Sequence, residues 1–319
     1  MSKVSVFQLP IGSHIEPASV RGYYIDLREK AETPVWPPPW FPFPGFHRFI
    51  AVGQWGLAAY ERYVAGEGDE WLEATLAAAR HLVEKQERSP GREGGWLEPF
   101  DYPHTLRMRG PWLSAMAQGH CASVLARAYR ETGDERFAES ARTALIPMEV
   151  PTEAGGAMGT LDGRRFPEEY PTVPASFVLN GAIYALWGIY DVWRGIGDDD
   201  ARAFFEEIAG TLCDNLQRWD TGYWSRYDLY SHPVTINVAS GSYHALHVNQ
   251  LRALHQLLPE RAVLAATADR FERYAHRGLN RALAFSHKAA FRLIVPRNHF
   301  FARTLPWLQP PHESYVPPG

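Results

Sequence analysis

The sequence has few features of a secreted, membrane-bound or nucleic-acid-binding protein. Its 319 residues include two cysteines, too few for a disulfide framework or a cysteine-rich zinc site. Basic residues are not in excess, because 32 Lys and Arg stand against 36 Asp and Glu, so nucleic acid is not an expected partner. No stretch approaches the roughly 18 uncharged apolar residues of a membrane span, and the start lacks the apolar core of a signal peptide. We therefore expect a cytoplasmic protein with reduced thiols.

Aromatic side chains are abundant: 11 Trp, 15 Tyr and 16 Phe make up 13% of the chain, and 13 His are also present. Most large planar rings belong to a hydrophobic core. Rings also line sugar-binding sites, because the C–H faces of a sugar stack on them. The composition is thus compatible with a carbohydrate ligand without establishing one.

Prolines gather near both ends of the chain. Residues 33–45 contain six prolines, and prolines recur from 296 to 319. Proline fixes φ and removes a backbone donor, so both segments are expected to be extended rather than helical. This predicts an N-terminal arm over 1–45, one helical domain over 46–295 and a C-terminal tail over 296–319.

A four-fold repeat organises the helical part. Each copy opens with an amide residue and continues with apolar residues at helical spacing. The first three copies stop at Gly-Asp, where glycine supplies a left-handed C-terminal position and aspartate caps the next helix. The opening amides are Gln54, Gln118, Asn180 and Asn249, and the Gly-Asp pairs are 68–69, 133–134 and 197–198.

The repeat predicts four helical hairpins, and hence an all-α fold. The first helix of each pair is the more uniformly apolar and is expected inside, which predicts an (α/α) toroid. The long connections into the inner helices, at 87–111, 149–173 and 219–240, should meet at one end and form the cleft. The predicted pairs are 46–65 with 69–86, 112–132 with 134–148, 174–195 with 198–218 and 241–258 with 260–279.

Several motifs lie just before the inner helices. They include Ser114-Ala-Met-Ala-Gln-Gly119, Glu168-Glu-Tyr-Pro-Thr172, Tyr227-Asp-Leu229 and Tyr243-His244. In this order they resemble the C-terminal helical domain of D-glucuronyl C5-epimerases, which invert C5 of glucuronate within heparan-type polysaccharides. The resemblance covers roughly residues 46–275. It implies an (α/α) barrel and a partner that is a uronate-containing polysaccharide or oligosaccharide. No cofactor is expected, because the chain has no P-loop, no dinucleotide fingerprint after a strand and no complete set of metal ligands.

The resemblance also implies catalytic residues. C5 of a uronate lies next to a carboxylate, so its proton is very weakly acidic, and inversion needs one group on each face of the sugar. Position by position, the resemblance places this role on Glu169 and Tyr243 as the opposed acid and base. Tyr170 and Tyr227 are expected to relay protons or contact the carboxylate.

Other polar residues are candidates for substrate contacts. His244 and His247 share a helix face, but no third metal ligand is evident, so hydrogen bonding is favoured over metal binding. The amides either bond each other or face sugar hydroxyls, and Cys121 is expected to be a buried core thiol. The predicted substrate-binding residues are Arg107, Arg109, Gln118, His120, Asn180, His244, His247 and Asn249.

The chain departs from the family pattern at three places. Tyr230 stands where an arginine is expected and Leu113 where a tyrosine is expected, and about 45 residues precede the predicted toroid, where the family is expected to have an N-terminal β-rich domain. The segment 21–30 and the aromatic, Pro-rich segment 33–45 are candidates to cover the cleft instead. A toroid glycoside hydrolase using two of Glu98, Asp101, Glu169 and Asp228, a uronate lyase and a non-catalytic glycan-binding protein stay open as alternatives, and so does a homodimer.

Overall fold

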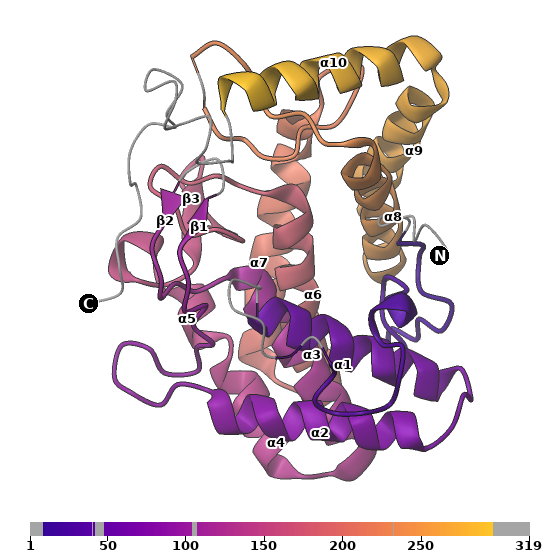
Figure 1. Cartoon of the computed structure of the whole chain (residues 1–319), viewed down its shortest axis with the longest axis vertical. Helices are drawn as coiled ribbons and strands as arrows, with labels where there is room; N and C mark the ends of the chain where they lie inside the picture. The colour runs from indigo at the N-terminus through magenta and orange to yellow at the C-terminus, as the bar shows by residue number, and fades with distance from the viewer. Residues whose placement is uncertain (1–8, 40, 42–47, 104–106, 232, 296–319) are drawn as a thin grey trace.

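Helical hairpins make up most of the molecule. The computed structural model describes residues 9–39, 41, 48–103, 107–231 and 233–295, and Figure 1 shows their arrangement. The four predicted hairpins are confirmed, which gives the expected all-α architecture. The inner helices are α1 (Arg48–Val64), α3 (Ala115–Thr132), α6 (Leu179–Ile196) and α8 (Gly241–Leu257), and their partners are α2 (Glu70–Lys85), α4 (Glu135–Thr143), α7 (Asp199–Asn215) and α9 (Ala262–His276).

Two of the three Gly-Asp joints form as the sequence predicts. Gly133 (φ 68°) and Gly197 (φ 81°) end α3 and α6 in the left-handed conformation. The side chains of Asp134 and Asp198 each accept a backbone N–H from the first turn of the next helix. Asp69, at the joint between α1 and α2, makes no such bond.

The inner helices pack in chain order, α1 against α3, α3 against α6 and α6 against α8. Helix α6 is buried from Leu179 to Val192, as the sequence predicts for an inner helix. Its contact with α3 is backbone against backbone: a Cβ added at Gly119 would lie 2.6 Å from the carbonyl oxygen of Tyr184. The absence of a side chain at Gly119 therefore sets the spacing between these two helices.

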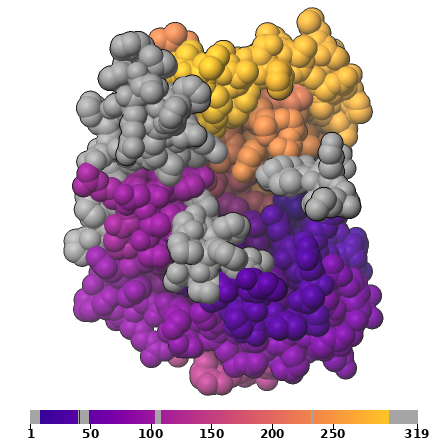
Figure 2. Space-filling model, viewed as in Figure 1, coloured from indigo at the N-terminus to yellow at the C-terminus, as the bar shows by residue number. Residues whose placement is uncertain are grey.

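The N-terminal segment Leu9–Ala31 contacts all four inner helices, and it includes the short 3-10 turn η1 (Arg28–Lys30). Figures 1 and 2 show it in indigo beside α1. Arg127 of α3 donates to the carbonyl of Gly22 (3.0 Å), and Asn249 of α8 donates to that of Leu9 (2.8 Å). Tyr24 donates to Asp191 near the end of α6, and the backbone N–H of Tyr23 donates to Glu61 of α1.

These contacts correct one expectation. Residues 21–30 pack near the C-terminal ends of α1, α3 and α6, whereas the predicted catalytic residues lie toward the N-terminal ends of α6 and α8. The physical reason is that the rings of Tyr23 and Tyr24 are buried, at 0% and 2% exposure, against Trp187 of α6 and the Arg127 guanidinium of α3. The segment therefore packs against the C-terminal halves of α1, α3 and α6, at the opposite end from the predicted cleft.

Several elements were not expected from the sequence. Helix α10 packs on α8 and α9 after the fourth hairpin, and two short antiparallel hairpins form in the first two long connections. The C-terminal tail 296–319 lies outside the described residues. The further elements are α10 (Gly278–Ile294), β1 (Tyr102–Pro103), β2 (Arg107–Met108), β3 (Met158–Leu161), β4 (Arg164–Pro167), α5 (Ile146–Glu149), η2 (Thr152–Ala154) and η3 (Leu216–Trp219).

Two further findings concern membrane-spanning helices and the cysteines. Among the described residues, none of the helices combines the length and apolar character that a membrane crossing requires. Cys121 and Cys213 are both buried and unpaired, as predicted.

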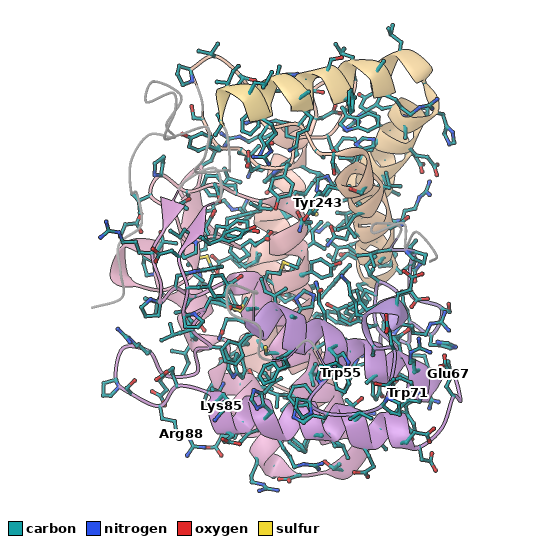
Figure 3. All side chains as sticks on the ribbon, in the orientation of Figure 1. Trp55, Glu67, Trp71, Lys85, Arg88 and Tyr243 are labelled. Carbon is teal, nitrogen blue, oxygen red and sulfur yellow. The ribbon has the colours of Figure 1, made fainter. Side chains whose placement is uncertain are left out.

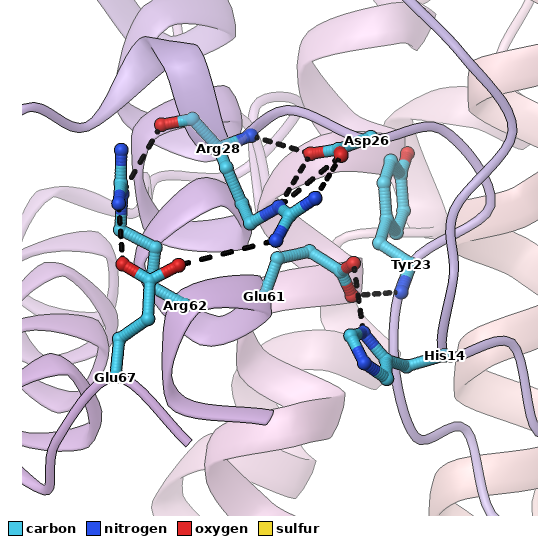
Figure 4. Close-up of polar contacts among 7 residues, drawn as sticks. All are labelled: His14, Tyr23, Asp26, Arg28, Glu61, Arg62 and Glu67. Carbon is cyan, nitrogen blue, oxygen red and sulfur yellow. Dashed lines mark hydrogen bonds and ion pairs between the residues drawn. The ribbon is translucent and has the colours of Figure 1, made fainter. Parts of the chain in front are cut away.

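Figure 4 shows how the N-terminal segment is fastened to α1. Arg62 donates to the carbonyl of Ala31 (2.7 Å) and pairs with Glu67. Glu61 is 1% exposed and accepts from the backbone of Tyr23, with His14 Nδ1 3.9 Å away. Burial raises the pKa of Glu61 to about 7, although the charge of Arg127 opposes this shift.

The raised pKa of Glu61 predicts a pH-dependent contribution to stability. The contribution is fully present below the unfolded-state pKa and is lost as pH rises through about 7, because the ionised carboxylate must then stay buried. We expect the free energy of unfolding of the wild type to fall, relative to that of Glu61→Gln, by on the order of 3 kcal/mol between about pH 5 and pH 8. Urea unfolding across this range checks it. Parallel pH curves for the two proteins would show that Glu61 titrates normally.

Candidate active site

The chain after β4 carries two adjacent glutamates with different environments. Glu168 is fully buried and accepts the backbone N–H groups of Ser176 and Phe177, both at 3.0 Å, and the Ser176 hydroxyl at 2.9 Å. Burial raises its pKa to about 8. Glu168 is therefore a buried, hydrogen-bonded carboxylate, unlike a solvated carboxylate of a surface loop. It ties β4 to the segment that leads into α6.

Glu169 faces the start of α6. It is 4% exposed, and the side-chain amide of Asn180 approaches its Oε2 at 3.4 Å. A Cβ at Gly181 would overlap the Glu169 side chain, so this carboxylate occupies the space left by the glycine. The sequence Asn180-Gly181 thus provides both a polar contact and the room that Glu169 needs.

A cluster of tyrosines from the three long connections and from α8 lies beside this carboxylate. Tyr170 stacks on Tyr102, with ring centroids 5.5 Å apart, while Tyr227 meets Tyr243 edge-on at 4.9 Å. The pKa of Tyr170 is raised well above its ordinary value, mainly by burial and then by the negative charge of Glu169, with smaller contributions from Tyr227, Tyr102 and Tyr243. The four residues predicted to be catalytic therefore lie together, and Figure 3 shows the half-buried Tyr243 in the region between α6 and α8.

Tyr184 extends this cluster and was not predicted from the sequence. It lies one turn after Asn180 on α6, is 1% exposed, and its hydroxyl has no hydrogen-bond partner among the described residues. Burial raises its pKa, and Tyr243 and Glu169 raise it further. The i to i+4 spacing from Asn180 was the available signal, since residues at that spacing share a helix face.

His120, a predicted substrate contact, lies against Tyr184 with ring centroids 4.4 Å apart. Its Nδ1 donates to the carbonyl of Met116 (3.0 Å), and its Nε2 has no partner among the described residues. Burial lowers the pKa of His120 to about 3, so the imidazole is neutral at physiological pH. It can offer one uncharged nitrogen to the interior.

His244 and His247 brace the third connection against α8. Their Nδ1 atoms lie 2.8 and 2.9 Å from the Ser225 hydroxyl, and His244 Nε2 donates to the carbonyl of Phe271 (2.8 Å). His244 also stacks on Trp224 with centroids 3.7 Å apart. Burial lowers the pKa of both, that of His244 to about 4. These contacts hold the connection that carries Tyr227.

Two of the other predicted contacts, Gln118 and Asn249, have their hydrogen-bond partners elsewhere. Gln118 donates to the carbonyls of Gly94 and Ala144 and accepts from Trp96 N, so its burial needs neither another amide nor a sugar. Asn249 is bonded to the N-terminal segment. Arg109 is exposed, and the side chain of Arg107 lies outside the described residues.

Two of the carboxylates considered for a hydrolase accept backbone N–H groups, and the two residues that depart from the family pattern are buried. Glu98 accepts the Phe49 backbone N–H (3.0 Å) at the start of α1, and Asp101 accepts that of Gly110 (3.0 Å). Leu113 and Tyr230 are buried at 2% and 4% exposure. Among the described residues, no three His, Cys, Asp or Glu side chains form a group suited to a metal ion.

Comparisons with known proteins identify the family and the fold of this chain. The family model described as "D-glucuronyl C5-epimerase C-terminus" matches residues 90–273. A D-glucuronyl C5-epimerase of Caenorhabditis elegans is 35% identical over 246 residues, covering 72% of this chain and 39% of that protein. An uncharacterized protein of Methanocaldococcus jannaschii is 29% identical over 178 residues, covering 52% of this chain and 57% of that protein.

The chain thus spans well under two thirds of the length of these curated relatives. The fold is similar to that of an unsaturated glucuronyl hydrolase from Streptococcus agalactiae, with a TM-score of 0.51 and 16% identity over 72% of this chain and 59% of that one. At this identity the likeness concerns the toroid fold alone. The matched span includes Glu169, Tyr170, Tyr227 and Tyr243, and it covers more than half of the chain. The chain therefore belongs to the D-glucuronyl C5-epimerase family, in the part that corresponds to the C-terminal domain.

Proposed function

We propose that this protein is a uronosyl C5-epimerase that acts on a uronate-containing glycan. The observation that supports this most directly is the convergence of Glu169 and Tyr170, from the second long connection, with Tyr227 from the third and Tyr243 from α8. The family membership points to the same reaction. A heparosan-like substrate, a cytoplasmic location and a homodimer stay predictions.

The chemistry requires two groups on opposite faces of the sugar. Removing the C5 proton adds negative charge beside an existing carboxylate, so the base must be held close and the site must be shielded from water. In the proposal, Glu169 and Tyr243 exchange the C5 proton from the two faces, while Tyr170 and Tyr227 contact the substrate or relay protons. The aromatic rings provide flat surfaces for the sugar and exclude water.

The proposal includes no metal or organic cofactor. His244 and His247 are the pair most similar to metal ligands, but Ser225 bonds both Nδ1 atoms and Phe271 bonds the Nε2 of His244. Their lowered pKa values keep both rings neutral, as hydrogen-bonding groups within the protein.

Incubation of the protein with candidate uronans in D₂O tests the reaction. We expect solvent deuterium at C5, formation of the epimer and unchanged chain length. New reducing ends would indicate a hydrolase instead, and an unsaturated uronate chromophore would indicate a lyase. Tight binding of a uronan without any of these products would favour a glycan-binding protein.

Removal of either proposed acid/base group should slow the reaction. We expect Glu169→Gln and Tyr243→Phe each to lower kcat for epimerisation by at least about 10²-fold, the lower range for a positioned acid or base. Stability should change little, because both substitutions nearly preserve shape. Tyr190→Phe, which removes a hydroxyl near the other end of α6, serves as the control. Rates within a few-fold of wild type in both variants would contradict the assignment.

The space at Gly181 gives a second test of Glu169. A methyl group there would displace the Glu169 side chain, and small displacements of catalytic groups are costly. We expect Gly181→Ala to lower kcat by about 10- to 100-fold while the fold is retained by circular dichroism. Gly241→Ala, at the first residue of α8, is the matched control, because its added methyl meets nothing within 4 Å. Equal activity in both variants would show that the position of Glu169 is unimportant.

A further inference from the structure

Helix α10 follows the span matched by the family model and contacts the connection that carries Tyr227. His287 lies 2.6 Å from the Tyr223 hydroxyl through Nδ1 and 3.3 Å from Thr235 Oγ1 through Nε2. Ala284 and Phe291 are the buried residues of this helix. The helix thus holds the connection from its outer side.

Lys288 is directed from α10 into the connection. Its ammonium donates to Asn237 Oδ1 at 2.6 Å and to the carbonyl of Val238 at 2.8 Å. The same nitrogen lies 5.4 Å from the centre of the Tyr227 ring. A lysine ammonium is strongly hydrated in water, so its placement in a half-buried site requires these acceptors.

Asn237 connects Lys288 to the backbone of the Tyr227-Asp228 motif. The backbone carbonyl of Asn237 accepts the Tyr227 N–H (2.7 Å), and its side-chain Nδ2 donates to Asp228 Oδ2 (2.6 Å). Lys288 therefore acts on Tyr227 in two ways, by orienting Asn237 and by placing a positive charge beside the ring.

We propose that Lys288 is a positioning residue for the reaction, holding Tyr227 through Asn237 and stabilising the negative charge that this tyrosine acquires when it gives up its proton. The inference rests on the proposed function, in which Tyr227 relays protons or contacts the substrate carboxylate. A cation near a buried phenol favours its ionised form, and it is also attracted to the face of the ring.

The groups around Tyr227 are consistent with this role. Tyr243 faces it from α8, and Tyr170 faces it from the segment after β4. Asp228 is the carboxylate next to it, and burial raises the pKa of Asp228 to about 6, so this group is ionised at neutral pH. Lys288 shares the compensation of that charge with Arg226 and Arg292, and Glu169 acts on the neighbouring Tyr170.

Two variants separate the charge of Lys288 from its packing. We expect Lys288→Met to lower kcat by at least about tenfold with little change in KM, and Lys288→Arg to restore most of the rate. The acid limb of the pH profile should move to higher pH by about one unit in the methionine variant. Lys85→Met, at an exposed position on α2, is the control.

A second measurement needs no turnover. NMR of protein carrying isotope-labelled tyrosine Cζ follows each phenol, and Tyr227→Phe identifies the relevant signal. We expect Tyr227 to ionise at lower pH in the wild type than in Lys288→Met, and Lys288→Gln replaces the methionine variant if that variant does not fold. Unchanged titration, or no ionisation of Tyr227 before the wild type unfolds, would overturn the proposal. This titration stands even if no uronan is epimerised, so failure of the two proposals can be distinguished.

Discussion

The buried ion pair between Arg127 and Asp191 joins α3, α6 and the N-terminal segment at one point. Arg127 donates to Asp191 (2.6 Å), to the Ser123 carbonyl (2.9 Å) and to the Gly22 carbonyl, and Tyr24 donates to the other oxygen of Asp191. Both charged side chains are at most 1% exposed. Loss of one partner would leave an uncompensated buried charge, which typically costs about 3–5 kcal/mol. The position of α6, and with it Asn180 and Gly181, depends on this contact.

The site combines a nearly water-free environment with groups that must exchange protons. Burial raises the pKa of Tyr170 and Tyr184, and it lowers the pKa of His120 and His244. At physiological pH these histidines and phenols are therefore uncharged. A phenolate formed during proton exchange would need a nearby positive charge. Lys288 places such a charge beside the Tyr227 ring.

The sequence predicted the hairpins because helix period and capping residues are local properties. Gly133 and Gly197 adopt the left-handed conformation that the Gly-Asp pattern required. Helix α10 was not predicted because it follows the fourth hairpin and forms no part of the repeat from which the hairpins were predicted. The β-hairpins have strands of two to four residues, too short for an alternating pattern.

Only part of the site could be predicted, because sequence motifs are local and tertiary contacts are not. Motifs located Glu169 and Tyr243, but tertiary partners decided the roles of the amides. Gln118 is occupied by the backbone of the first long connection, while Asn180 approaches Glu169, although both open a repeat in the same way. Tyr184 and Lys288 became candidates only through their neighbours in space.

Stereospecific exchange tests the two-sided mechanism most directly. Glycans of each C5 epimer, labelled with deuterium at C5, would be incubated with Glu169→Gln and with Tyr243→Phe, and loss of label would be followed by NMR. We expect each variant to lose the exchange of deuterium from one epimer and to retain it for the other. The two variants should show opposite preferences. Washout reduced equally for both epimers in both variants would contradict the placement of Glu169 and Tyr243 on opposite faces of the sugar.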